Sequence, residues 1–271
     1  MLICNKTSSG DVLGYIVHGH VSICSWKRPE GPARVWRVVE GRKKLADGKI
    51  PKFSIQEVPV ELEQDVVDFM TRYFVPDEVI CASLDLINDP PALREMRSFW
   101  KKLLSQGISV VALQENSDPV AKPVIAGANI LSVSTLADAG NRDKGTPFRS
   151  DALKKLVSII EELEHEADVL NKFNVDRYLN ALGLCVHPSF RGQGLGDEIL
   201  RTRDAIGLAY QIPVSGTVFT GPASQLVASR VGFQVSIERK YREILDEAGN
   251  PVLPRVKCDY IKLMVKKLYR S

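Results

Sequence analysis

A chain of 271 residues is long enough for one large domain or two small ones, with a substantial buried core. Its 44% hydrophobic and 25% charged residues are ordinary for a globular protein. The 36 basic and 33 acidic residues leave a formal charge of +3, which is too balanced to favour a nucleic-acid partner. No apolar run reaches the ~18 residues of a membrane-spanning helix, so we expect no membrane partner.

The cysteines and the N-terminus set the expected compartment. The five cysteines are odd in number, lie far apart and form no C-x-x-C pair. Neither a zinc site nor a disulfide framework is therefore expected, and no metal is assigned. Free thiols are usual in a reducing compartment, and the first 20 residues lack the features of a signal or transit peptide. We expect a cytoplasmic protein.

The first 33 residues are punctuated by glycine and proline and carry no periodic apolar pattern. Residues 1–33 are predicted to form a poorly ordered and dispensable extension, and residues 34–271 the domain itself. Within the domain, residues 35–39 fit either a short strand or the lead-in to a helix. Residues 52–58 alternate between polar and apolar side chains and predict the first core strand.

Helical and strand patterns alternate along the rest of the chain. Apolar residues at helical spacing predict helices over residues 61–74, 89–105, 150–170, 195–209 and 222–231. Apolar runs and period-two alternation predict strands over residues 108–113, 124–133, 178–186, 214–219, 233–244 and 258–268, the last two antiparallel. A polar loop is expected over residues 138–147. This order is typical of a single mixed α+β domain.

The most informative stretch is a strand followed by a proline turn and a glycine-rich loop. Three glycines, Gly192, Gly194 and Gly196, lie where an amphipathic helix begins. Free N–H groups and the helix dipole favour an anion at such a helix start, and glycines let the backbone approach it closely. The G-x-G-x-x-G and G-x-x-x-x-G-K-[ST] signatures are absent. The residues therefore predict a pyrophosphate site of another kind, against the alternative of a structural turn.

The order Arg191-x-x-Gly194-x-Gly196 resembles the acyl-CoA signature [RQ]-x-x-G-x-[GA] of the GNAT superfamily of N-acetyltransferases. The order of strands and helices from about residue 50 onward is similar to the GNAT order. The resemblance implies a mixed, mostly antiparallel seven-stranded sheet with helices on both faces, and acetyl-CoA as acyl donor. The cosubstrate-binding residues that it implies are Leu184, Cys185, Val186, Arg191, Gly192, Gln193, Gly194, Leu195 and Gly196.

Further segments resemble the insect arylalkylamine N-acetyltransferase-like family. They are Lys52–Gln56, Val67–Met70, Tyr73–Glu78, Asp89-Pro90, Phe99-Trp100, Gly127–Asn129 and Gly232-Phe233. The family's D-E-P-L sequence reads Asp77-Glu78-Val79-Ile80 here, so the carboxylate pair is kept and the proline is lost. The family acetylates aromatic ethylamines such as dopamine, tyramine, octopamine and serotonin, and some members prefer polyamines.

The chemistry of amine acetylation selects candidate catalytic residues. An ammonium must lose a proton before it attacks a thioester, and a carboxylate in a partly apolar pocket can take that proton. Glu78 matches the family's glutamate and is the candidate base, with Asp77 second; the alternative is a pair of solvated loop acids. Thr220 and Ser224 match the family's serines and are candidates for protonating the thiolate, whereas Ser224 could also simply serve its helix start.

Two other groups near the loop are assigned by their chemistry. We expect Cys185 to be a buried structural thiol, because no base is evident for the alternative of an acyl-enzyme. We expect His187 to pack in its turn. A backbone N–H at Cys185 or Val186, on a splayed strand end, is expected to meet the thioester oxygen.

The leading hypothesis is an N-acetyltransferase that moves an acetyl group from acetyl-CoA to a small primary amine of arylalkylamine type. The transfer is direct, with a carboxylate as general base. The alternatives are an N-acyltransferase for long-chain acyl-CoA, polyamines or amino acids, and a catalytically weakened acyl-CoA-binding protein. The expected partner is a small-molecule amine, and the expected state is a monomer.

Overall fold

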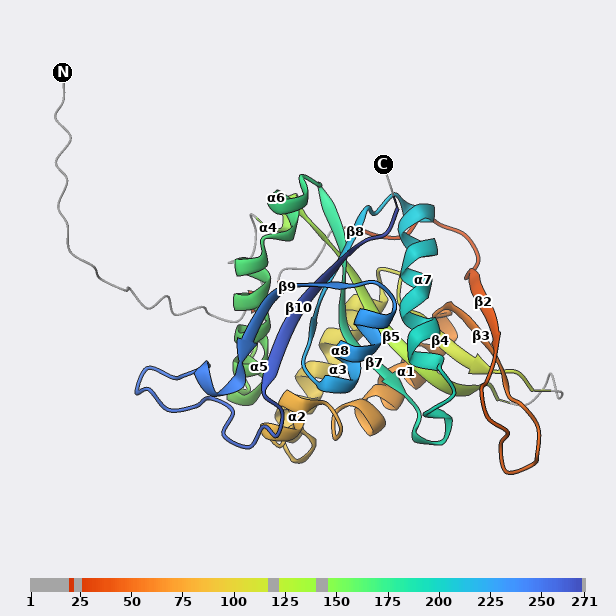
Figure 1. Cartoon of the computed structure of the whole chain (residues 1–271), viewed down its shortest axis with the longest axis horizontal. Coiled ribbons are helices and arrows are strands. Elements are labelled where there is room, and N and C mark those ends of the chain that lie inside the picture. The colour runs from red at the N-terminus through yellow and green to blue at the C-terminus, as the bar shows by residue number, and fades with distance from the viewer. Residues whose placement is uncertain (1–19, 22–25, 117–121, 140–145, 270–271) are drawn as a thin grey trace, which may run out of the picture.

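The computed structural model describes residues 20–21, 26–116, 122–139 and 146–269. A mixed sheet forms its centre, with strands in the order β2-β3-β4-β5-β7-β8-β10-β9 (Figure 1). These strands are β2 (Val35–Glu40), β3 (Lys52–Glu57), β4 (Val110–Gln114), β5 (Val124–Thr135), β7 (Arg177–Val186), β8 (Val214–Phe219), β9 (Gln234–Lys240) and β10 (Tyr260–Lys267). All neighbours are antiparallel except β7 and β8. A second sheet pairs β1 (His20–Val21) with β6 (Thr146–Pro147).

Helices cover both faces of the main sheet (Figure 1). They are α1 (Glu63–Phe69), α2 (Val79–Ser83), α3 (Pro90–Leu104), α4 (Leu136–Ala139), α5 (Asp151–Ala167), α6 (Val169–Phe173), α7 (Leu195–Tyr210) and α8 (Pro222–Arg230). Helices α1, α3 and α5 pack on one face, and α7 and α8 on the other. Side chains along β4 point alternately to the two faces of the sheet. Val111 belongs to the core on the first face, and Val110 and Ala112 belong to the core on the second.

The mixed, mostly antiparallel architecture is confirmed, but the main sheet has eight strands rather than seven. The additional strand is β2, which pairs with β3 at the sheet edge. Its side chains are mostly exposed. The sequence of residues 35–39 therefore lacks the apolar alternation that would have favoured a strand over the lead-in to a helix. Helix α2 was not predicted, because its five residues are too few for a helical period.

Local sequence sets the start of the two long helices on the first face. Asp89 caps α3 by accepting a hydrogen bond from the Ala92 N–H at 3.0 Å, and prolines occupy the first turn. Ser150 caps α5 through the Leu153 N–H at 3.3 Å. Helix α5 ends sooner than predicted, because Asp168 adopts a left-handed φ of 39° and a new helix follows it.

The predicted helix over residues 61–74 changes character along its length. A 3₁₀ turn (Val60–Leu62) leads into α1, and a π-helical turn (Met70–Phe74) follows α1. The π turn adds a residue to the helical repeat, a feature common at functional sites. It delivers the segment that carries Asp77 and Glu78.

Residues 26–33, which the sequence assigned to the extension, contact the domain. The ring of Trp26 lies edge-on to Tyr210, with ring centroids 6.0 Å apart. The Arg28 N–H donates to the Gln106 carbonyl at 2.9 Å, and its guanidinium lies 3.4 Å from the carboxylate of Glu57, which is buried. Of the rest of the extension, only residues 20–21 lie within the described part of the chain.

The parallel strands β7 and β8 separate to form an opening in the sheet. They pair at Leu179 and Ser215 and then diverge. The edge of β7 from Leu182 to Val186 is therefore not covered by β8. This opening positions the candidate site.

Candidate active site

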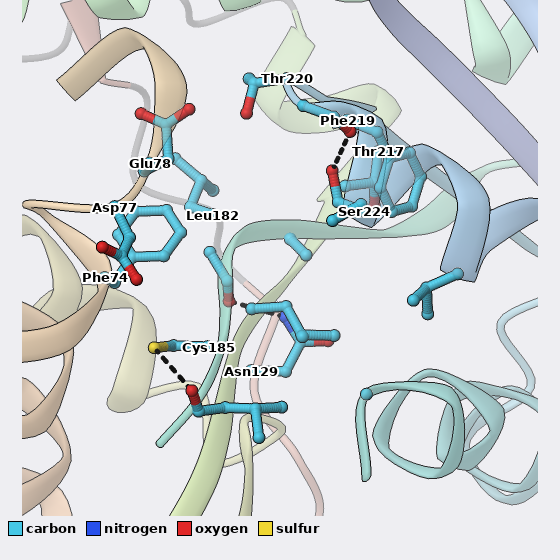
Figure 2. Close-up of a pocket in the computed structure, with 18 of the residues that line it drawn as sticks. Phe74, Asp77, Glu78, Asn129, Leu182, Cys185, Thr217, Phe219, Thr220 and Ser224 are labelled. Atoms are coloured by element: carbon cyan, nitrogen blue, oxygen red, sulfur yellow. Dashed lines mark hydrogen bonds between the residues drawn. The ribbon is translucent and has the colours of Figure 1, made fainter. Parts of the chain in front are cut away.

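A cavity of about 680 Å³ occupies the opening between β7 and β8. Its walls come from the ends of these strands, the starts of α7 and α8, the segment after the π turn, and the inner faces of α3 and α5. Figure 2 shows Asp77 and Glu78 on one side of the cavity, and Thr220 and Ser224 on the other. The structure thus brings together the predicted anion loop and the predicted catalytic residues.

The glycine-rich loop has the geometry of an anion site. Gly192 and Gly194 have φ values of 77° and 80°, a left-handed conformation that favours glycine. Gly194 immediately precedes α7, and no side chain caps this helix, so its first N–H groups are available to a ligand. A Cβ at Gly196 would meet no protein atom closer than 4.0 Å. The loop therefore leaves room beside the helix start.

Basic side chains from two other elements surround this helix start. Arg42, in the connection between β2 and β3, and Arg230, at the end of α8, pair with Asp197 in the first turn of α7 at 3.4 and 2.7 Å. They neutralise an acid that would otherwise repel an anion. The predictions missed these residues, because 155 positions separate Arg42 from its partner in the sequence.

Gln193 fixes the β2–β3 connection against the loop. Its side-chain oxygen accepts a hydrogen bond from the Lys43 N–H at 2.8 Å, and its amide donates to the Lys43 carbonyl at 3.0 Å. The amine of Lys43 lies 3.1 Å from the place that a Cβ of Gly192 would take. The buried Gln193 side chain therefore positions Lys43 beside the glycine-rich loop.

Arg191 connects the anion loop to the acidic segment. Its guanidinium forms an ion pair with Asp77 and donates to the Val186 carbonyl at 3.3 Å. This pair ties Asp77, the second candidate base, to a permanent cation. The side chain of Leu195, another predicted binding residue, packs in the core between α7 and the sheet.

The backbone of β7 presents N–H groups to the opening. The His187 N–H donates to the Ala126 carbonyl at 2.9 Å, and hydrogen-bonded pairs alternate along an antiparallel ladder. Cys185 therefore bonds to β5, whereas the N–H groups of Leu184 and Val186 face away from it. Of the two predicted donors to the thioester, Val186 fits this pattern and Cys185 does not, and Leu184 fits as well.

A bulge shapes this part of β7. The register with β5 shifts between Asn129 and Leu131, and Gly183 has a φ of 119°. The Asn129 side-chain amide donates to the Gly183 carbonyl at 2.8 Å (Figure 2). The Trp100 indole donates to the Leu182 carbonyl at 3.1 Å. These two side chains hold the bulge from the two faces of the sheet.

Cys185 lies in the cavity wall but is poorly suited to nucleophilic attack. The residue is buried, and burial raises the pKa of its thiol to about 12, despite the nearby charge of Arg191. The thiol is therefore protonated at neutral pH, and a thiol is a weak nucleophile.

His187 packs rather than acting in the cavity. Its ring lies 4.5 Å from that of Tyr73 and 5.6 Å from that of Phe190, between centroids. Burial, together with the charges of Arg72 and Arg191, lowers the pKa of His187. The ring is therefore neutral at neutral pH, and its Nδ1 accepts a hydrogen bond from the Ser189 N–H at 3.2 Å.

Glu78 both caps a helix and lines the cavity. It is the N-cap of α2, where its carboxylate accepts hydrogen bonds from the N–H groups of Ile80 at 3.1 Å and Cys81 at 2.7 Å. It also lines the cavity. Its charge raises the pKa of buried Cys81 and Tyr241 further than burial alone. The two capping bonds hold the carboxylate in a fixed place and leave lone pairs on both oxygens.

The two hydroxyl candidates differ in their hydrogen bonding. The Ser224 hydroxyl donates to the Gly221 carbonyl at 2.9 Å, a bond within the first turn of α8. The Thr220 hydroxyl has no hydrogen-bond partner among the described residues, while the Thr220 carbonyl accepts from Tyr241 at 2.7 Å. Thr220 is therefore fixed through its backbone, with its hydroxyl available to a ligand.

Part of the cavity wall is aromatic and aliphatic. Phe74, Phe99 and Trp100 line it together with apolar residues of α5 such as Leu153 and Val157. The rings of Phe74 and Trp100 meet edge to face, 6.0 Å apart between centroids. This part of the wall can accommodate an apolar or aromatic body.

No group of three or more His, Cys, Asp or Glu side chains is placed to hold a metal ion within the described ranges. No helix in the described part of the chain is both long and apolar enough to cross a bilayer.

Solved structures with the same architecture identify the class. No family model matches the chain, and no curated protein matches it. The chain is 32% identical to a protein of the yellow fever mosquito Aedes aegypti that is named arylalkylamine N-acetyltransferase 7. The two structures match with a TM-score of 0.81 over 90% of this chain and 100% of that one. Arylalkylamine N-acetyltransferase 2 of the same mosquito is 22% identical, with a TM-score of 0.71 over 80% and 99%. The polyamine N-acetyltransferase of Drosophila melanogaster, which forms N-acetylagmatine, is 19% identical, with a TM-score of 0.67 over 79% and 99%.

The splayed parallel strand pair and the glycine loop at a helix start, on this sheet order, define a GNAT-fold N-acetyltransferase. The extent of the likeness to the mosquito protein narrows the class further. The chain belongs to the insect arylalkylamine N-acetyltransferase family.

Proposed function

We propose that this enzyme transfers the acetyl group of acetyl-CoA to a small primary arylalkylamine. The observation that carries the proposal is the distribution of charge in the cavity. Three acidic side chains line it within the described residues, and two of them, Asp77 and Asp197, are already paired with arginines. Among the described residues, Glu78 remains as the lining acid without a basic partner, and it shares the cavity with the aromatic side chains of Phe74, Phe99 and Trp100.

This distribution favours an aromatic monoamine over a polyamine. One carboxylate can receive one ammonium, and the aromatic walls can receive an apolar body. A polyamine would bring a second cation against these aromatic and aliphatic walls, where burying an unpaired charge is costly. The polyamine alternative therefore fits these walls less well.

The loop and its surroundings suit the phosphates of acetyl-CoA. The helix start at Leu195 supplies N–H groups, and Arg42, Lys43 and Arg230 supply positive charge nearby. Bound there, the cosubstrate would extend along the uncovered edge of β7 toward Glu78. The N–H groups of Leu184 and Val186 would donate to its polar groups, including the thioester oxygen as negative charge develops on it.

Direct transfer requires two proton movements. The Glu78 carboxylate takes a proton from the ammonium, directly or through water. The amine nitrogen then bonds to the acetyl carbon, the carbon–sulfur bond breaks, and the second proton of the nitrogen passes to the departing thiolate. The free hydroxyl of Thr220 can relay it, giving its own proton to the sulfur and taking the proton of the nitrogen in exchange. The hydroxyl of Ser224 is less suited to this relay, because it is bonded within its helix.

A panel of acceptors and donors tests the proposal. Thiol release is measured with acetyl-CoA and longer acyl-CoAs against tyramine, dopamine, serotonin, agmatine, spermidine and free amino acids. We expect the highest kcat/KM for an aromatic ethylamine with acetyl-CoA. A preference for spermidine or agmatine would identify a polyamine acetyltransferase, and acyl-CoA binding without release in any pair would identify a weakened enzyme.

A further inference from the structure

A buried arginine lies in the wall of the cavity where β7 and β8 separate. Arg203, on α7, is 1% exposed and borders the cavity. Its guanidinium donates to the Asn129 side-chain oxygen from Nε at 3.3 Å and from Nη2 at 2.9 Å. Nη1 donates to the hydroxyls of Ser215 at 3.1 Å and Thr217 at 2.8 Å. Every one of these partners is neutral.

No carboxylate pairs with Arg203 among the residues that the structure describes. Phe233 covers the guanidinium, with its ring centroid 5.6 Å away. Burial lowers the pKa of Arg203 to about 9, which still leaves it charged at neutral pH. An unpaired buried cation is costly, and an apolar residue of similar volume would fill the space at lower cost. Such a group in a cavity wall is a candidate for a functional role.

The hydrogen bonds of Arg203 connect the three strands around the opening. Asn129 is on β5, and Ser215 and Thr217 are on β8. The Ser215 hydroxyl donates in turn to the Leu179 carbonyl of β7 at 2.9 Å. The guanidinium thus lies beside the point where β7 and β8 stop pairing, and it joins side-chain oxygens of the flanking strands β5 and β8.

One of these connections reaches the backbone that faces the thioester. Asn129 uses its oxygen for Arg203 and its amide for the Gly183 carbonyl, at 2.8 Å. A planar trans peptide places the next N–H, that of Leu184, opposite this carbonyl. Arg203 orients Asn129, Asn129 holds the Gly183 carbonyl, and the direction of the Leu184 N–H follows.

We propose that Arg203 and Asn129 are positioning residues for acetyl transfer, which fix the Gly183–Leu184 peptide so that its N–H meets the thioester oxygen. The proposal rests on the proposed function for its catalytic part. The cation adds positive potential on the same side, where negative charge develops during attack.

The variant Asn129→Asp gives the sharpest test. The aspartate keeps an acceptor for Arg203 and supplies the missing carboxylate, so the buried charge is paired. It replaces the amide that donates to Gly183 with an oxygen that repels the carbonyl. We expect kcat to fall by about 10-fold to 100-fold, somewhat less than the usual loss of a direct oxyanion donor, with the acetyl-CoA Kd unchanged.

Two further variants complete the experiment. Arg203→Met removes the guanidinium at similar volume and is expected to lower kcat in the same way. Arg201→Met is the matched control, because Arg201 is exposed on the same helix, and it should leave kcat unchanged. If Arg203→Met does not fold, Asn129→Asp decides the question.

Hydrogen exchange gives a readout that does not depend on turnover. Amides between Leu179 and Val186 should exchange faster in Asn129→Asp than in the wild type, with the rest of the sheet unchanged. Wild-type kcat and wild-type exchange in Asn129→Asp would overturn the proposal, as would a loss of kcat that only follows a loss of folded protein. A wild-type chain inactive on every amine would overturn the proposed function, while exchange would still decide whether these residues hold the peptide.

Discussion

Replacing Glu78 can separate a catalytic base from a helix cap. Its carboxylate accepts two N–H groups, from Ile80 at 3.1 Å and Cys81 at 2.7 Å. Glu78→Gln offers one acceptor oxygen to these two donors, so part of the cap is lost. Losing an N-cap costs about 1 kcal/mol, which lowers the Tm of a domain of this size by roughly 2–4 °C. Glu78→Ser keeps a good capping oxygen and removes the base.

The two variants should differ in Tm but show a similar loss of kcat. Glu78→Ser should hold the wild-type Tm better than Glu78→Gln. Both should lose about 10²-fold or more in kcat near neutral pH, the usual contribution of a general base. Raising the pH should restore part of the rate, because more of the amine arrives deprotonated. An unchanged acetyl-CoA Kd would show that the cosubstrate half of the cavity is intact.

The measurements are kcat/KM by thiol release as a function of pH, and Tm by calorimetry. If Glu78→Ser retains the wild-type kcat/KM and pH profile, the reasoning is refuted and Glu78 serves only α2. Asp77, released from Arg191, or water activated by backbone groups would then be the next candidate. Asp77→Asn, which removes that ion pair but not Glu78, is the matched control and should lose far less activity.

Three further predictions follow from the geometry. Gly196→Val places atoms where the protein leaves space, so the chain should fold while the acetyl-CoA Kd rises about tenfold or more, or ~1.4 kcal/mol; an unchanged Kd by calorimetric titration would remove the phosphate site from this loop. Cys185→Ala should keep kcat within a few-fold, because burial raises the thiol pKa to about 12; a loss of several orders of magnitude would instead support an acyl-enzyme. Removing the first 33 residues deletes Arg28 and leaves buried Glu57 short of a partner, which should cost about 1–3 kcal/mol in denaturant unfolding; a chain that lacks only the first 25 residues is the control, and equal stability of the two would show that Arg28 contributes nothing.

Much of the scaffold was accessible from the sequence because its signals are local. Strand β8 has the predicted bounds, and α3 and α5 start within one residue of the predicted helix starts, with Asp89 and Ser150 as their caps. Period-two and helical spacing record which face of each element is buried. The glycines of the loop mark a helix start where the backbone takes left-handed angles. Such patterns depend on neighbours within a few residues, so a single chain displays them.

The sequence by itself determined the mixed α+β domain, the glycine-rich loop at a helix start and the set of candidate residues, whereas the contacts among these residues were decided by tertiary structure. Packing placed Arg42 beside Asp197, paired Arg191 with Asp77, and buried Arg203 among neutral partners at the point where two strands diverge. The pairs Arg42–Asp197, Arg191–Asp77 and Arg203–Asn129 join residues that are 155, 114 and 74 positions apart. No local period encodes such pairs, because they depend on how the layers of the fold meet. The packing of these layers decides whether a charged side chain is paired or unpaired, and this in turn decides which residues can act in catalysis.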